Sequence, residues 1–171
     1  MAIVRALRGF EPRFGKDCFL AETAVVVGEV VMGDRCTVWY HAVVRGDVHS
    51  ITIGDDTNIQ DGAIIHCTYQ KAKTVIGNKV SIAHQAVIHG CTVEDEVLIG
   101  MGAIVMDDAV IGTGSVIAAG AIILPGTKVE PGSIYAGIPA RKIKDVGAEM
   151  KAVIERTAKN YPMYAEWYKN Q

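Results

Sequence analysis

The fold is decided by the stretch "IGMGAI VMDDAV IGTGSV IAAGAI ILPGTK VEPGSI", residues 99–134, which forms six hexapeptides in a row. Each hexapeptide opens with Ile or Val, and its fifth residue is Ala, Ser or Thr. An amphipathic helix needs an apolar period near 3.6 residues and a half-buried strand alternates every two, so a strict period of six fits neither. The period predicts one short strand and one turn per hexapeptide, stacked into a parallel β-helix with the first residue inward and the small fifth residue at a tight corner.

The same phase continues toward the N-terminus, but the steps on either side of residues 76–88 are irregular. Aliphatic residues keep the six-residue step at Met32, Val38 and Val44, at Ile53, Ile59 and Ile65, and at Ile76, Ile82 and Ile88. Eleven residues separate Ile65 from Ile76, and only five separate Ile88 from Val93, across "HGCTV" at residues 89–93. Three of the five histidines of the chain lie around these irregular steps.

Hexapeptides of this form resemble those of the left-handed β-helix superfamily, over about residues 11 to 140. The resemblance implies an all-β fold, a left-handed parallel β-helix whose coils have three faces. After Pro139 the rhythm stops, and from Asp145 the apolar residues follow a helical spacing that ends near Pro162. We therefore expect a β-helix domain over residues 1–144, with a short N-terminal segment, and a C-terminal helix over residues 145–171 that packs on it.

Composition and charge exclude several classes of partner. The 17 basic and 19 acidic residues are interspersed, so no basic patch indicates nucleic acid binding. No apolar run approaches the ~18 residues of a membrane span, and the first residues lack the features of a secretory signal. The four cysteines form no CxxC pair, which is typical of a reducing compartment. We expect a cytoplasmic protein that binds neither nucleic acid nor membrane.

Two histidines are predicted to stand side by side. If the long step holds one six-residue side and a five-residue loop, Ile65 and Ile88 share a face on neighbouring coils, about 4.8 Å apart. His66 and His89 directly follow them, so one metal ion can bridge both imidazoles. His84 leaves from another face, and a neighbouring chain in a threefold assembly could bring it to the same ion. Three neutral imidazoles with an open fourth position are the pattern of a catalytic zinc site. The short step at residues 89–93 would then aim His89 at the ion.

A second group of polar residues precedes the histidines. Arg45 and Gln60 occupy the same outward place in their hexapeptides, and Asp47, Asn58 and Asp61 lie beside them. We expect these groups to line up on the outer surface near the metal. A guanidinium beside a carboxylate can lock the pair, orient a metal-bound water or clamp an oxyanion. An ion pair between subunits, from Arg45 to Asp47 or Asp61, is an equally supported alternative.

The strings "RGD" (45–47), "TNIQDG" (57–62) and "GC" (90–91), together with the three histidines, resemble the γ-class carbonic anhydrase family, zinc enzymes on a trimeric left-handed β-helix. The resemblance spans nearly the whole chain. It implies a homotrimer that hydrates CO2 reversibly to bicarbonate by a metal-bound hydroxide, with zinc as the metal and iron or cobalt as alternatives. It makes His66, His84 and His89 the metal ligands. Gln60 and Asp61 become the residues that orient and activate the metal-bound water, and Asn58 becomes a residue near the substrate. Tyr161 is a residue that the helix brings toward the site, and Arg45 and Asp47 are a structural ion pair at the subunit interface.

This chain departs from the family where the proton must leave. The most active members of the family carry glutamates as proton shuttles, one directly after "RGD" and others in a loop after the first histidine. Here Val48 follows Asp47, and the loop "TYQKAKT", residues 68–74, is basic and holds no carboxylate. Because proton export is often the slow step in such a cycle, we expect slow CO2 hydration or another substrate.

Two other functions fit the same repeat. "YAGIPARKI", residues 135–143, also resembles the end of the repeat in hexapeptide acyltransferases, which use one histidine base and a groove for acyl-coenzyme A. That interpretation leaves two matched histidines unexplained. A non-catalytic scaffold that carries a metal is the third alternative, and the fold alone does not separate the three. Cys67 and Cys91 adjoin two of the histidines and could be soft ligands, but we expect them to be packing residues.

Overall fold

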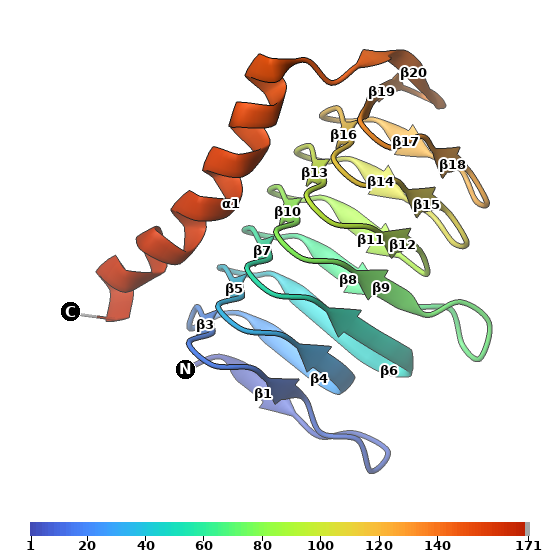
Figure 1. Cartoon of the computed structure of the whole chain (residues 1–171). Coiled ribbons are helices and arrows are strands. Elements are labelled where there is room, and N and C mark those ends of the chain that lie inside the picture. Colours follow the sequence, from blue (N-terminus) through green and yellow to red (C-terminus); the bar gives the residue numbers. More distant parts are fainter. Residues whose placement is uncertain (170–171) are drawn as a thin grey trace.

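The computed structural model describes residues 1–169, whose backbone winds as a parallel β-helix with one helix along its side (Figure 1). The strands form one twelve-stranded and one eight-stranded sheet. Every neighbouring pair of coils is joined by parallel strands, and the single antiparallel pair of named strands, β19 with β20, follows the last coil. The predicted fold class is confirmed: short parallel strands stack as expected of a left-handed β-helix, and a C-terminal helix follows them.

Most strands span only two or three residues, which leaves the rest of each hexapeptide for its turn. The twelve-stranded sheet contains β1 Ile3–Arg5, β2 Arg13–Phe14, β4 Val25–Met32, β6 Val43–Ile53, β8 Ile64–His66, β9 Thr74–Ile76, β11 Val87–His89, β12 Thr92–Val93, β14 Ile104–Val105, β15 Val110–Ile111, β17 Ile122–Ile123 and β18 Lys128–Val129. The eight-stranded sheet contains β3 Phe19–Leu20, β5 Thr37–Val38, β7 Asn58–Ile59, β10 Ser81–Ile82, β13 Leu98–Ile99, β16 Val116–Ile117, β19 Ser133–Gly137 and β20 Ala140–Asp145. The helix α1 is Ala148–Lys169.

The twelve-stranded sheet covers two faces of the β-helix because its long strands run through the corner between them. The start of β6, at Val44, pairs with β8, and its end, at Ile53, pairs with β9. The strands β8 and β9 therefore lie on different faces, although they belong to one sheet. The eight-stranded sheet forms the third face.

The interior is a column of aliphatic side chains. Each residue predicted to point inward, at the six-residue positions from Met32 to Val129, is at most 3% exposed. At the corners, Ala103, Ala109 and Ser115 are fully buried, as their small size requires. Since burying one Val or Ile side chain contributes about 1.5–3 kcal/mol, this column is the main source of stability.

The irregular steps change the length of single coils without interrupting the column. Ile99 pairs with Ile117, eighteen residues on, which is the regular coil. Ile59 pairs with Ile82, 23 residues on, because the loop between β8 and β9 projects from its coil. Ile82 pairs with Ile99, only seventeen residues on, because the corner after β11 is one residue short. Both irregularities fall at the corner that follows β8 and β11.

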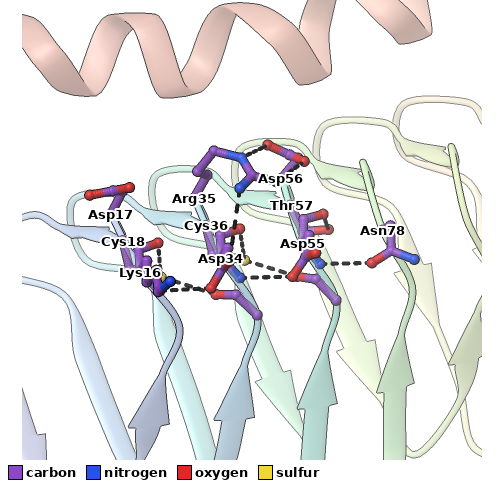
Figure 2. Close-up of polar contacts among 12 residues, drawn as sticks. Lys16, Asp17, Cys18, Asp34, Arg35, Cys36, Asp55, Asp56, Thr57 and Asn78 are labelled. Atoms are coloured by element: carbon purple, nitrogen blue, oxygen red, sulfur yellow. Dashed lines mark hydrogen bonds and ion pairs between the residues drawn. The ribbon is translucent and has the colours of Figure 1, made fainter.

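One corner is held by a ladder of hydrogen bonds from backbone to side chain (Figure 2). Asp34 Oδ1 accepts from the Lys16 amide at 2.7 Å, Asp55 Oδ1 from the Asp34 amide at 2.8 Å, and Asn78 Oδ1 from the Asp55 amide at 2.8 Å. Each side chain thus satisfies a turn N–H of the preceding coil, which the strand ladder does not reach. A glycine precedes each of these amides on the chain because the acceptor oxygen fills the space of its Cβ: at Gly54 a Cβ would lie 2.5 Å from Asn78 Oδ1.

The helix α1 runs back along the stack, from the last coil toward the first coils (Figure 1). Near its start, Ile154 packs with Val116. Near its end, the ring of Tyr168 lies 5.7 Å from that of Phe19 and 5.5 Å from that of Trp39. The helix therefore covers the face made by β5, β7 and β10.

The expectation that this helix ends near Pro162 is wrong, because α1 continues through Pro162 to Lys169. A proline inside a helix removes one hydrogen bond and costs on the order of 3 kcal/mol. Here the second half of the helix is packed on the β-helix, with Ala165 only 1% exposed. This packing stabilises the turns that the proline alone would end.

The predicted boundary between residues 144 and 145 falls at the end of β20, and α1 begins three residues later at Ala148. The last two residues of the predicted C-terminal unit, 170–171, lie outside the described residues. The division into two domains stays a prediction.

Among residues 1–169 no helix is long and apolar enough to cross a membrane, and the four cysteines are free thiols.

We expect Gly54→Ala to destabilise the fold by about 1–3 kcal/mol, because the new methyl group must displace Asn78 or the Gly77 backbone from the corner ladder. The measurement is the free energy of unfolding in urea. Gly147→Ala is the matched control, since a Cβ at Gly147 meets no atom within 4 Å. Equal stability of the two variants would contradict the role given to the ladder.

Candidate metal centre

The structure brings His66 and His89 side by side. His66 ends β8 and His89 ends β11, and these two strands lie side by side (Figure 1). The two residues are direct partners in the parallel ladder. Their facing ring nitrogens, His66 Nδ1 and His89 Nε2, are 3.1 Å apart. The stacking predicted from the coil count is therefore present, and their role as metal ligands stays a prediction.

Each of the two rings is held on its outer side by a carboxylate. Asp47 Oδ1 lies 3.0 Å from His66 Nε2, and Asp107 Oδ1 lies 2.6 Å from His89 Nδ1. A carboxylate only accepts, so each outer nitrogen carries the proton and each inner nitrogen is left as an acceptor. Two such nitrogens 3.1 Å apart can be bridged by a metal ion. The donor set therefore fits a metal ion, and a histidine that ligates a metal usually donates its other N–H in this way.

Both carboxylates have further partners. Arg45 Nη1 forms an ion pair with Asp47 within the same chain, and Thr68 Oγ1 donates to Asp107 Oδ2. Burial acts to raise the pKa of both carboxyl groups, but the hydrogen bonds they accept outweigh burial and lower both pKa values. The two groups are therefore anions at neutral pH. The place of Arg45 and Asp47 at a subunit interface stays a prediction.

Burial is the main cause that lowers the pKa of His66, whose side chain is 17% exposed. A lowered pKa keeps the imidazole neutral near pH 7. The neutral ring is the form that binds a metal ion, so the local environment favours ligation without the loss of a proton.

The short step at residues 89–93 contains a glycine that Asp107 approaches closely. Gly90 has a φ of +56°, and a Cβ at this position would lie 2.5 Å from Asp107 Oδ1 and 2.8 Å from the Cβ of Ala72. The glycine thus leaves room for a carboxylate that belongs to the next coil. That the short step aims His89 at a metal stays a prediction; the structure adds the partner that the short corner accommodates.

His84 does not join this pair within one chain. It follows β10 of the eight-stranded sheet, and its Nδ1 lies 2.8 Å from Asp61 Oδ2 on the preceding coil. Both side chains are more than two-fifths exposed, at 41% and 44%. Within residues 1–169 of a single chain, no group of three His, Cys, Asp or Glu side chains is arranged to hold a metal ion. That a neighbouring chain brings His84 to the pair stays a prediction.

Asn58 and Gln60 do not line the outer surface, so that expectation is wrong for these two residues. Asn58 is 0% and Gln60 3% exposed, because α1 covers the strand β7 on which this segment begins. Gln60 Nε2 donates to Asn58 Oδ1 at 2.9 Å, and Asn58 Nδ2 donates to Ser81 Oγ at 2.8 Å. The two side-chain amides, which precede Asp61 on the chain, form a buried hydrogen-bond network.

Tyr161 approaches Asp61 from α1, and both side chains line the same pocket. Burial, with the negative charge of Asp61 as the second cause, raises the pKa of Tyr161 to about 12. The phenol is therefore neutral at physiological pH. Its catalytic role stays a prediction.

Sequence analysis does not single out Asp107 or Thr68, although both support the histidine pair. Asp107 lies eighteen residues after His89, which is one regular coil, so a search at coil-length intervals from each histidine would have found it. Thr68 lies in the projecting loop, and no periodicity places it.

Cys67 and Cys91 face the core, where each is 1% exposed. Burial raises the pKa of both thiols, that of Cys91 to about 12. Protonated thiols inside the aliphatic column are packing residues, as expected.

Comparisons with known proteins give relatives of two kinds. The family model described as "Bacterial transferase hexapeptide (six repeats)" matches residues 90–125. "Probable carbonic anhydrase" of Methanocaldococcus jannaschii is 52% identical over 151 residues, which cover 88% of this chain and 94% of that protein. "Gamma carbonic anhydrase 1, mitochondrial" of Arabidopsis thaliana is 39% identical over 91% of this chain, and the match spans only 58% of its length. A crystal structure from Bacillus cereus, described as a candidate acetyltransferase, is 31% identical with a TM-score of 0.96 and covers 99% of this chain and 98% of its own.

Asp107→Asn should weaken zinc binding about 10- to 100-fold, because the neutral amide holds the His89 N–H less firmly and lowers the basicity of the opposite nitrogen. The measurement is competition for zinc with a chromophoric chelator on metal-free protein. Asp108→Asn is the matched control, since Asp108 is exposed and its substitution removes the same charge. Unchanged zinc affinity in Asp107→Asn would exclude the positioning role.

Proposed function

Because the chain belongs to the γ-carbonic-anhydrase-like family of hexapeptide-repeat proteins, we propose that it is a metal-dependent carbonic anhydrase, which hydrates CO2 reversibly to bicarbonate. The observation that carries this proposal is the pair of facing imidazole nitrogens, 3.1 Å apart, on His66 and His89. A histidine that acts as a general base needs no second acceptor nitrogen beside it. Two such nitrogens, each backed by a carboxylate, support ligation of a cation.

The ligand set that we propose combines His66 and His89 of one chain with His84 of a neighbouring chain in a homotrimer. The exposure of His84 and its separation from the pair within one chain support this arrangement. Zinc bound to three imidazoles would lower the pKa of a bound water to about 7 and supply the nucleophile for CO2. Iron and cobalt are the alternative metals.

Asp61 is the residue that we propose as the proton acceptor and orienting group, because it touches His84 and is open to solvent. Gln60 Nε2 donates one of its two N–H groups to Asn58 Oδ1, which orients the amide and leaves its oxygen and one N–H for the site. Asn58 is fully buried and therefore acts through Gln60 as a positioning residue. Tyr161 closes the same pocket as a neutral hydrogen-bond donor.

Export of the proton is the step for which this site has no glutamate carrier. Val48 lines a pocket of about 180 Å³ beside Asp47, at the place where the active members of the family carry a glutamate. Glu29 and His49 line the same pocket, so two other titratable groups lie along this route. Within residues 1–169 the hydrogen bonds of the His66 ring go to His89 and Asp47 and to neither of these two groups, which supports a slow transfer step.

Acyl transfer from acyl-coenzyme A is the second candidate function, favoured by the structural match to the Bacillus cereus protein. Metal analysis separates the two proposals. About one zinc or iron per chain without coenzyme A binding supports the carbonic anhydrase, and coenzyme A binding by metal-free protein supports acyl transfer. Metal without CO2 hydration or coenzyme A binding supports a scaffold.

We expect complementation between His66→Ala and His84→Ala chains that are unfolded and refolded together. Neither pure variant has an intact site, because each lacks one of the three ligands at every junction. In a mixed cyclic trimer one junction joins an intact His66 and His89 pair to an intact His84, so random equal mixing should restore about a quarter of the wild-type zinc per chain. Zinc is measured by emission spectroscopy.

The control is a mixture of His66→Ala with His89→Ala chains. Both substitutions remove ligands from the same side of the junction, so no junction in that mixture is intact. Zero zinc recovery in verified mixed trimers of the first kind would contradict a shared site, and recovery in the control would contradict the assignment of the two sides.

Hydration of CO2 should be slow in weak buffer and should rise with imidazole buffers, because the buffer carries the proton that the chain exports poorly. Val48→Glu should raise the rate at low buffer concentration. Val48→Gln is the matched control, with nearly the same shape but no acidic proton. A high rate that does not depend on buffer, or an equal gain in both variants, would show that proton export is not limiting.

A further inference from the structure

The aromatic residues of this chain are concentrated beside Asp61. A pocket of about 260 Å³ lies where the end of α1 meets the turns that follow β5 and β7. Six of the eleven Phe, Trp and Tyr residues of the chain line it. In a chain that is only 6% aromatic, this concentration is not explained by the aliphatic core, which lies on the other side of the strands.

The rings of the pocket form a box. The planes of Tyr161 and Tyr168 stand at 77° and 80° to that of Trp39, with centroids 5.6 and 5.5 Å from it. The indole is fixed, since it is 5% exposed and its Nε1 donates to Thr37 Oγ1 at 3.0 Å. Tyr161 and Tyr168 therefore pack edge to face with the rigid indole, which fixes both rings at the inner side of the pocket.

The outer side of the box is open to solvent. Trp167 is 59% and Tyr168 45% exposed, although both are large and apolar. Tyr164 continues the wall, 5.0 Å from the ring of Trp167. Exposed aromatic rings around a concave site are typical of a ligand pocket and not of a surface left free in water.

The charge of the box is negative. Asp61 is the only ionised side chain in its lining, which contains no lysine or arginine. The contact with His84 uses Asp61 Oδ2, which leaves Oδ1 for a second partner. Burial raises the pKa of Tyr40, and a hydrogen bond to Glu22 raises it further, so a second carboxylate lies at the edge of the box.

From the rings and the carboxylate together we propose that this box binds a small organic ammonium cation. The faces of Trp and Tyr attract a positive charge, and alkyl groups on the nitrogen bury apolar surface against them. A metal ion prefers several oxygen or nitrogen donors and gains little from ring faces. A neutral apolar ligand would gain nothing from the charge of Asp61, whose Oδ1 faces no partner that His84 supplies. This ligand goes beyond the proposed CO2 hydration: the box shares Asp61 and Tyr161 with the proposed site, but binding of the cation requires neither a metal ion nor CO2.

The test uses choline and its neutral isostere, 3,3-dimethyl-1-butanol, with the intact protein. Both tryptophans of the chain line the pocket, so intrinsic tryptophan fluorescence reports on this site alone. We expect saturable binding of choline, with an affinity about 10-fold or more above that of the isostere, because only choline carries the charge. Calorimetry provides a second measurement that does not depend on fluorescence.

Two variants locate the site. Trp167→Leu and Asp61→Asn should each weaken choline binding about 10-fold, the first by removing a ring face and the second by removing the charge. Since both side chains are well exposed, neither change should unfold the protein, and thermal unfolding checks this. Tyr69→Leu is the control, because Tyr69 is an exposed aromatic residue outside the pocket.

Three results would overturn the proposal: no saturable binding of choline, equal binding of the isostere, or full affinity in folded Trp167→Leu protein. Binding is measured without CO2, so an inactive protein that binds choline would overturn the proposed function and leave this site in place. An active protein that does not bind choline would do the reverse.

Discussion

The pairing of each coil with the next, residue for residue, is the constraint on which the rest of this structure depends. Parallel strands fix the separation of neighbouring coils at about 4.8 Å, and they hold inward residues of successive coils in one column. Whatever stands at one position of a coil therefore stands beside its counterpart on the next. The aliphatic column, the corner ladder from Asp34 to Asn78 and the pair of His66 and His89 are three consequences of this single geometry.

The candidate metal centre uses this geometry twice. The ladder places the two imidazoles side by side, and the coils on either side supply the carboxylates of Asp47 and Asp107 that hold their outer nitrogens. A helix surface could not deliver four such groups in a row, because its neighbours three and four residues apart diverge around the axis. Since His84 leaves from the third face, the same rigid geometry that joins two histidines keeps the third away within one chain.

The helix α1 gives the β-helix a second kind of surface. Near its start it packs Ile154 against Val116, and farther along it covers the strand that carries Asn58, whose amide is buried with that of Gln60. At its end the contacts change from aliphatic to aromatic, and the rings of Tyr161 and Tyr168 pack at steep angles to Trp39. That packing stabilises the helical turns after Pro162. It also leaves an open aromatic box next to Asp61.

The sequence by itself determined the repeat, the inward residues from Met32 to Val129 and the neighbouring positions of His66 and His89. It could do so because in a β-helix a spacing in sequence converts directly into a position in space. Only the tertiary structure decided that Asp107 backs His89, that α1 buries Asn58 and Gln60, and that the helix continues through Pro162. Asp107 lies one regular coil after His89, but only the folded chain shows that its carboxylate turns toward the ring. The other two findings depend on a helix that folds back over coils far away in the sequence, a distance that the six-residue period does not record.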